Sequence, residues 1–247
     1  MDIYVTILCG GKGSRMNSDI PKVLHKVKGQ EMVTRIINEI ILLNPKKILI
    51  IVNNNNINQI KDTINETINK TNKTINIKYI IQKKQLGTGD AVKCSIETLK
   101  NKNGINLIIN GDMPLIKYEI IQNIINDYVL NINNIFMLIT GITLNDPGKN
   151  GRIFIEDNNV KIIEYKDCNE NEITNNLINV GIYCVDIQTL INNIIKIDNN
   201  NAQNEYYLTD LIKFIKPNKV HILENKYSKY ILGVNDINEL EIVNNIN

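Results

Sequence analysis

A segment near the N-terminus gathers the residue types that bind phosphate groups. Its members, three glycines and three cations, are Gly10, Gly11, Lys12, Gly13, Arg15 and Lys22. Glycine lets backbone N–H groups approach phosphate oxygens closely, and the basic side chains supply positive charge where a triphosphate would lie. The spacing matches neither a P-loop nor the dinucleotide fingerprint Gly-x-Gly-x-x-Gly. We therefore predict a phosphate-binding loop, with a glycine-rich turn carrying solvated basic residues as the alternative.

Two oxygen-bearing side chains stand directly after apolar runs further along the chain. Asp112 follows the run 106–110 closely, and Asn235 follows the run 230–234. At the end of a strand, an Asp or Asn is more often a turn residue than a ligand. We nevertheless expect the carboxylate of Asp112 to project from the carboxyl edge of a sheet into a cleft, where open α/β sheets bind their ligands.

The elements that position these residues are indicated by apolar, β-branched runs that alternate with stretches of helical period. Strands are predicted at 3–9, 47–52, 77–81, 106–110 and 136–141. Helices are predicted at 31–43, 56–69, 88–100 and 118–130. This alternation is typical of βαβ units, so we predict an α/β fold with a doubly wound, mostly parallel sheet. Ligands should then bind where the loops after Cys9, Ile81 and Asn110 converge.

The pattern changes after residue 145. Residues 152–156 and 160–165 alternate around Asp157-Asn158-Asn159, which predicts a β-hairpin beside the main sheet. Further strands are predicted at 177–185, 219–223 and 230–234, and helices at 187–197, at 207–214 and from Asp236 onward. We expect one domain over residues 1–247.

The composition excludes several classes of protein. The 247 residues are 43% hydrophobic, and a net charge of +2 sets 28 basic against 26 acidic residues without a long basic block. That balance gives no surface for nucleic acid. No apolar run approaches the roughly 20 residues of a membrane helix, and residues 1–8 lack the pattern of a signal peptide. We expect a cytoplasmic protein without nucleic-acid or membrane partners.

The chain resembles the N-acetylglucosamine-1-phosphate uridyltransferases, specifically the N-terminal domain of the bifunctional bacterial enzyme, over nearly its whole length. The matching segments, in order, are 8–16, 21–27, 82–89, 111–116, 151–153, 164–167, 179–183, 201–210 and 233–235. The resemblance implies a nucleotide-diphospho-sugar transferase fold of the Rossmann-like type, and it implies two small-molecule substrates, UTP and N-acetylglucosamine 1-phosphate.

The reaction implied by the resemblance is attack of a sugar-phosphate oxygen on the α-phosphorus of UTP, with pyrophosphate leaving. Arg15 and Lys22 would stabilise charge on the transferred phosphate and on pyrophosphate. Asp112 and Asn235 would hold a catalytic Mg²⁺, which favours oxygen ligands and often takes only one or two protein groups besides substrate phosphates. Such a displacement needs positioning and neutralised oxygens more than a covalent nucleophile.

The same resemblance assigns further residues to substrate binding. For the nucleotide or the sugar phosphate they are Leu8, Cys9, Gly10, Gly11, Lys22, Asn110, Gly111, Asp112 and Asn235, with Gln82, Gly87 and Thr88 reading uracil. For the amino sugar they are Gly151, Glu164, Asn179, Tyr207 and Thr209. An amide side chain suits the imide edge of uracil because donors and acceptors complement each other. Thr88 would serve equally as the N-cap of a helix.

Two positions depart from the family pattern. Asn110 stands where the family usually has tyrosine, and Cys9-Gly10 replaces a common Ala-Ala pair. These departures bear on selectivity rather than on reaction type. The bifunctional enzyme continues into a left-handed β-helix that acetylates glucosamine 1-phosphate and forms a trimer. We expect both the acetyltransfer and that trimer contact to be absent here, and the oligomeric state stays open.

Two other functions compete with this one. A relative could act on another sugar phosphate or nucleotide, as a glucose-1-phosphate uridylyl- or thymidylyltransferase does, since one fold hosts many substrates. The segment 205–210 favours the amino sugar. A catalytically silent nucleotide-sugar-binding or regulatory subunit is the second alternative, and the joint presence of Arg15, Lys22, Asp112 and Asn235 argues against it.

Overall fold

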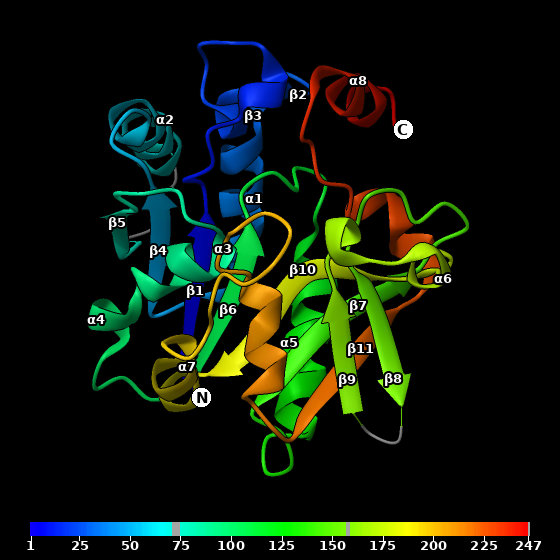
Figure 1. Ribbon diagram of the computed structural model, residues 1–247. Helices are drawn as coiled ribbons and strands as arrows, with labels where there is room; N and C mark the ends of the chain where they lie inside the picture. Colours follow the sequence, from blue (N-terminus) through cyan, green and yellow to red (C-terminus); the bar gives the residue numbers. More distant parts are fainter. Residues whose placement is uncertain (71–74, 157–158, 247) are drawn as a thin grey trace.

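A sheet of nine strands forms the centre of the protein, which a computed structural model describes over residues 1–70, 75–156 and 159–246 (Figure 1). Four of its strands are parallel neighbours. In spatial order they are β5 (Ile77–Ile81), β4 (Lys47–Val52), β1 (Ile3–Leu8) and β6 (Ile105–Asn110). β1 therefore has a partner on each side, and its carboxyl end lies between those of β4 and β6.

The other strands extend the sheet beyond β6. They are β7 (Met137–Thr143), β8 (Arg152–Glu156), β9 (Asn159–Ile163), β10 (Leu177–Asp186) and β11 (Asn218–Leu223). β10 is antiparallel to both β6 and β7, and β11 is parallel to β7 at the edge. β8 and β9 form the predicted hairpin, which joins the sheet through β10. The predicted turn residues Asp157 and Asn158 lie outside the described residues.

Helices flank this sheet. They are α1 (Met32–Ile40), α2 (Ile57–Asn69), α3 (Thr88–Lys93), α4 (Ile96–Leu99), α5 (Tyr118–Leu130), α6 (Glu170–Ile173), α7 (Ile187–Ile194) and α8 (Ile237–Asn245). The 3₁₀ helices are η1 (Ser14–Met16), η2 (Lys22–Leu24), η3 (Ile41–Leu43), η4 (Tyr165–Asp167), η5 (Leu208–Lys213) and η6 (Asn225–Tyr230). β2 (Lys26–Val27) and β3 (Gln30–Glu31) make a separate small sheet. Within the described ranges, none of the helices combines the length and the apolar character needed to cross a membrane.

The apolar character of β4 explains why helices cover both faces of the sheet. Ile48 and Ile50 pack with residues of α1, α2 and α5, whereas Leu49 packs on the other face with residues of α3, α4 and α7. Each of these three side chains is fully buried. A strand buried on both faces has a continuous apolar sequence, as strands of parallel sheets do. The doubly wound α/β fold is thereby confirmed.

The strand predicted at 230–234 is wrong. η6 ends at Tyr230, and the next residues form a loop. Ile231 and Val234 are buried, so their apolar pattern reflects packing from this loop. The N–H of Val234 donates to the carbonyl oxygen of Asp112 (2.9 Å) instead of joining a ladder with a neighbouring strand.

Two predicted helices also differ from the structure. Residues 207–214 contain the 3₁₀ helix η5 rather than an α-helix. The helix predicted at 88–100 is divided into α3 and α4 at Ser95. The Ser95 hydroxyl donates to the carbonyl oxygen of Val92 (2.6 Å), and a buried serine that bonds its own backbone in this way competes with regular helical bonding.

Candidate active site

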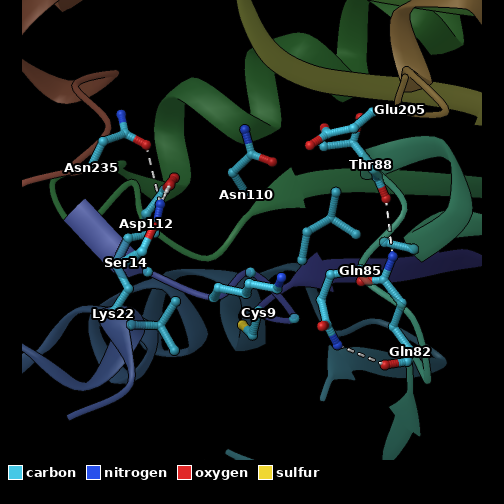
Figure 2. A pocket seen from close by; sticks show the side chains of 18 of the residues that line it. Cys9, Ser14, Lys22, Gln82, Gln85, Thr88, Asn110, Asp112, Glu205 and Asn235 are labelled. Carbon is cyan, nitrogen blue, oxygen red and sulfur yellow. Dashed lines mark hydrogen bonds and ion pairs between the residues drawn. The ribbon is translucent and has the colours of Figure 1, made fainter. Parts of the chain in front are cut away.

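A cavity of about 520 Å³ opens at the carboxyl ends of β1, β5 and β6, where a doubly wound sheet binds its ligands. Figure 2 shows Lys22, Asp112 and Asn235 at one end of this cavity, and Gln82 and Gln85 at the other. The predicted site residues that line it are Leu8, Cys9, Gly10, Gly11, Arg15, Lys22, Gln82, Gly87, Thr88, Asn110, Asp112 and Asn235. We call one end of the cavity the charged end; it consists of Arg15, Lys22, Asp112 and Asn235. We call the other the amide end; it consists of Gln82, Gln85, Gly87 and Thr88.

The glycine-rich loop lies between these ends, and its carbonyl groups are tied back into the protein. Asn53 Nδ2 donates to the carbonyl oxygen of Gly10 (3.0 Å), and Asn56 Nδ2 donates to that of Cys9 (2.9 Å). Within the part of the chain that the structure describes, the backbone N–H groups of Gly10 and Gly11 donate to no protein acceptor. Because both glycines line the cavity, their N–H groups are available to phosphate oxygens.

The side chains of the charged end meet around the Lys22 ammonium. Lys22 Nζ pairs with the carboxylate of Asp112 and donates to Asn235 Oδ1 (3.2 Å), which also accepts from Arg15 Nη2 (3.3 Å). The Lys22 and Asp112 side chains are only 17% and 16% exposed. Gly13 adopts a φ of 64°, and a Cβ there would lie 2.9 Å from the Cβ of Lys22. Glycine at this position therefore lets Lys22 approach the loop.

The loop that carries Asn235 is fastened to the strand edge that carries Asp112. Besides the bond from Val234 to the Asp112 carbonyl, the N–H of Asn235 donates to Glu239 Oε2 (2.6 Å) in α8. Asp236 caps the same helix by accepting from the N–H of Glu239 (2.9 Å). These bonds hold the Asn235 amide beside Asp112 although the two residues are far apart in the sequence.

The amide end is centred on Gln82, which is 3% exposed. Its N–H donates to the carbonyl of Val52 (2.8 Å), so β5 and β4 fix its backbone. Its side-chain Nε2 donates to the carbonyl oxygen of Gly87 (3.1 Å) and to Asp90 Oδ2 (2.8 Å). Gln85 adds a bond from its own Nε2 to the Gln82 carbonyl (3.2 Å). The Gln82 side chain is therefore held in one orientation.

Thr88 does not cap α3, so that alternative is wrong. The helix begins at Thr88 itself with Gly87 as the N-cap, and Thr88 Oγ1 instead accepts from the N–H of Leu208 (3.0 Å). The neighbouring N–H of Gly89 donates to the carbonyl oxygen of Tyr206 (2.7 Å). The start of α3 is thus fixed against the segment that leads into η5.

Two adjoining residues at the end of β6 have different surroundings. Gly111 does not line the cavity: its N–H donates to the Leu8 carbonyl (2.9 Å), and a Cβ on it would lie 2.5 Å from Cys9 Sγ. Asn110 does line it, in space that Gly181 leaves open, since a Cβ on Gly181 would lie 2.8 Å from Asn110 Nδ2. Gly111 therefore serves close packing of β6 against β1.

The five residues predicted around an amino sugar are divided in the structure. Glu164, Tyr207 and Thr209 line a separate cavity of about 280 Å³. Thr209 Oγ1 donates to Glu164 Oε1 (2.9 Å), and burial raises the pKa of Glu164. Gly151 and Asn179 line neither cavity, although a Cβ on Gly151 would lie 3.4 Å from Glu164 Oε2. The amide of Asn179 donates to a tyrosine hydroxyl of its own strand (2.6 Å).

Comparison with known proteins adds to this geometry. Residues 4–227 match the family model described as nucleotidyl transferase. This chain belongs to the nucleotidyl transferase family. A probable UDP-N-acetylglucosamine pyrophosphorylase of Acanthamoeba polyphaga mimivirus is 42% identical over 98% of this chain and 91% of that protein. The bifunctional protein GlmU of Clostridium botulinum is 41% identical over 96% of this chain, which spans only 51% of that relative.

Solved structures of other nucleotidyl transferases share the fold. One is a putative glucose-1-phosphate thymidylyltransferase from Bacillus anthracis, with a TM-score of 0.72 and 17% identity over 99% of this chain and 96% of that one. Another is a UDP-glucose pyrophosphorylase complexed with UDP-glucose, with a TM-score of 0.73 and 14% identity over 99% of this chain and 98% of that one. At such identities the likeness concerns the fold alone.

The cavity of this nucleotidyl transferase includes residues that the sequence-based assignment missed. Gln203 and Glu205 line it from the loop before η5. They lie in the matching segment 201–210, so the motif itself was a signal for them. Asn53 and Asn56 hold the glycine-rich loop from behind. They lie in an asparagine tract at the start of the predicted helix 56–69, and no motif marks them as part of the site. Their role depends on a tertiary contact that no local pattern encodes.

Proposed function

We propose that this protein transfers UMP from UTP to N-acetylglucosamine 1-phosphate, giving UDP-N-acetylglucosamine and pyrophosphate. The observation that carries the proposal is a single cavity with a cationic, glycine-rich phosphate-binding end and an oriented amide at the opposite end. The names of two relatives that are 42% and 41% identical support the same reaction. The proposal includes a cytoplasmic location, where UTP is supplied.

In this reaction one phosphate oxygen of the sugar phosphate forms a bond to the α-phosphorus of UTP. The bond from that phosphorus to the oxygen bridging the α- and β-phosphates breaks, and pyrophosphate leaves with the electron pair. Arg15 and Lys22 would neutralise the phosphate oxygens, and the N–H groups of Gly10 and Gly11 would orient them. The protein's contribution is therefore positioning and charge compensation.

The oxygens of the charged end fit a magnesium ion. Asp112 Oδ2 and Asn235 Oδ1 already converge on one cation, the Lys22 ammonium, which makes Lys22 a stand-in for a metal between them. Carboxylate and amide oxygens are ligands that Mg²⁺ accepts, and it often takes only one or two of them with substrate phosphates. Asp112 and Asn235 would hold the ion, which when bound would supply positive charge to the phosphates.

A cysteine nucleophile has no part in the proposal. Cys9 lines the cavity, but burial and the neighbouring Asp112 carboxylate raise the pKa of its thiol far above the ordinary value. The thiol form is a poor nucleophile, so a covalent UMP–enzyme intermediate on this residue is disfavoured. Direct attack by the sugar phosphate is the simpler route.

For the sugar, we propose the region around Glu164, Tyr207 and Thr209. The segment that contains residues 200–209 borders both cavities, with Gln203 and Glu205 on the nucleotide side and Tyr207 and Thr209 on the other. The half-buried Glu164 carboxylate accepts one hydroxyl bond from Thr209 and has further lone pairs for sugar hydroxyls.

The proposal is tested by incubating the protein with UTP, Mg²⁺ and either N-acetylglucosamine 1-phosphate or glucose 1-phosphate while pyrophosphate release is followed. We expect rapid release with the amino sugar phosphate and slower release with the glucose compound. Pyrophosphate release with glucose 1-phosphate alone would show that the protein acts on a different sugar phosphate. No release with either compound would indicate a protein that binds nucleotide sugars without catalysing the transfer.

A further inference from the structure

The orientation of the Gln82 side-chain amide follows from the hydrogen-bonding groups that surround it. Its nitrogen faces two groups, the carbonyl oxygen of Gly87 at 3.1 Å and Oδ2 of Asp90 at 2.8 Å. A carbonyl oxygen and a carboxylate oxygen both accept hydrogen bonds, so only the NH₂ side of the amide satisfies them. The carboxamide oxygen must therefore point the other way.

That oxygen faces the glycine-rich loop. A Cβ on Gly10 would lie only 2.8 Å from Gln82 Oε1, so the oxygen lies directly against this glycine. Gly10 and Gln82 both line the cavity. Figure 2 shows Gln82 at the end away from Lys22, Asp112 and Asn235. The amide end therefore offers an acceptor at this point of the cavity.

Asp90 is itself held in place. It lies in the first turn of α3, whose start is fixed by the bond from the Gly89 N–H to Tyr206 (2.7 Å) and by the bond from the Leu208 N–H to Thr88 (3.0 Å). The carboxylate therefore has a stable position from which to bind the Gln82 NH₂ group.

We propose that Asp90 is a positioning residue that fixes Gln82 as an acceptor and thereby selects a base with an imide N–H. This inference rests on the proposed function, which places a pyrimidine nucleotide in the cavity. Uracil and thymine carry N3–H, a donor, where cytosine carries a lone pair. A fixed acceptor opposite N3 can therefore accept a hydrogen bond from uracil or thymine. With cytosine two acceptors would face each other, and in a buried site this mismatch strongly disfavours binding.

The test measures nucleotide binding directly, by calorimetry without any sugar phosphate, for UTP, dTTP and CTP. The variant Asp90→Asn keeps the size of the side chain but replaces the carboxylate by an amide. Its neutral oxygen accepts more weakly than a carboxylate, and its NH₂ group can donate to a turned Gln82 amide. We expect the preference for UTP and dTTP over CTP to fall at least roughly tenfold, the change that corresponds to one oriented hydrogen bond. In turnover, KM for UTP should rise while kcat changes little.

Two controls separate positioning from a general effect. Glu97→Gln removes the same charge from an 86% exposed side chain on α4 and should leave the preference unchanged. In a Gln82→Leu background, Asp90→Asn should have no further effect on the preference, because Asp90 acts through Gln82.

Equal losses of UTP and CTP affinity in Asp90→Asn would mean that Asp90 only supports the fold, and the inference would be overturned. A preference effect that persists in the Gln82→Leu background would overturn it too. Failure of the proposed function is a separate result. If the protein bound UTP selectively but released no pyrophosphate, the proposed reaction would be wrong, while the role of Asp90 in selecting the base would stand.

Discussion

The two ends of the main cavity differ in whether their polar groups are free to bind a ligand. At the amide end, Gln82 is fixed by bonds to main-chain groups and to Asp90, so a base can bind there without breaking any of them. At the charged end, Lys22 binds the same two oxygens, of Asp112 and Asn235, that a metal would need. If the proposed function holds, base selectivity is preorganised, whereas phosphate and metal binding would require an exchange of partners.

The largest effect is expected from removing the metal or its carboxylate. Asp112→Ala should lower turnover by roughly a thousandfold or more, and EDTA should abolish activity that Mg²⁺ restores, because charge compensation at the phosphates is lost. Asn235→Ala should lower turnover less than Asp112→Ala does, but still severely. Steady-state rates, with far-UV circular dichroism to verify folding, check this prediction. Wild-type pyrophosphate release by Asp112→Ala would place the metal elsewhere.

Loss of the cations should come next in size. Arg15→Ala and Lys22→Ala should each lower kcat by roughly 10² to 10³, as removal of one charge-stabilising donor does elsewhere. UTP affinity measured by calorimetry should fall far less than kcat, because most of the stabilisation is expected in the transition state. If both variants turned over at the unmodified rate, the phosphate-binding role of this loop would be wrong.

How far the sequence predicts these two ends differs as well. Glycines followed by cations, and a carboxylate after an apolar strand, are local patterns, so the charged end could be assigned from them and from the family resemblance. The bond between Gln82 and Asp90 depends on the backbone turn at Gly87, with a φ of 118°, and on packing against Tyr206. No periodicity encodes such a contact. At Val234 the sequence likewise predicts a strand where the structure has a loop, because the apolar pattern there comes from tertiary packing that the sequence alone does not show.

A third prediction concerns the exchange at the charged end. Lys22→Gln should bind Mn²⁺, used as a probe for the metal, at least roughly tenfold more tightly than the unmodified protein without nucleotide, because the ion no longer displaces an ammonium group. Lys12→Gln is the matched control, since Lys12 is an exposed cation of the same loop and lines the same cavity. Free Mn²⁺ is measured by electron paramagnetic resonance. Equal tightening in both variants would indicate a general charge effect instead.

The smallest effect is expected away from both ends, at Glu164. Burial raises the pKa of this carboxyl from its ordinary value of 4.5 in the folded protein. The folded state therefore holds its proton more tightly than the unfolded state, and the free energy of unfolding falls as the pH rises from 4.5 through the raised pKa. Glu164→Gln should remove that fall and be the more stable protein at pH 8, but not at pH 4. Urea unfolding at both pH values measures this, and Glu97→Gln should show no such difference.

The central claim is tested most directly by one competition reaction, in which equal concentrations of UTP, CTP, N-acetylglucosamine 1-phosphate and glucosamine 1-phosphate are incubated with the protein and Mg²⁺. Mass spectrometry then resolves the four nucleotide sugars that can form. The proposed function predicts that UDP-N-acetylglucosamine dominates, because polar groups that pair with the imide at the amide end, and with the acetamide near Glu164, would be left unsatisfied by the competitors. Four products in comparable amounts, or no nucleotide sugar at all, would contradict it.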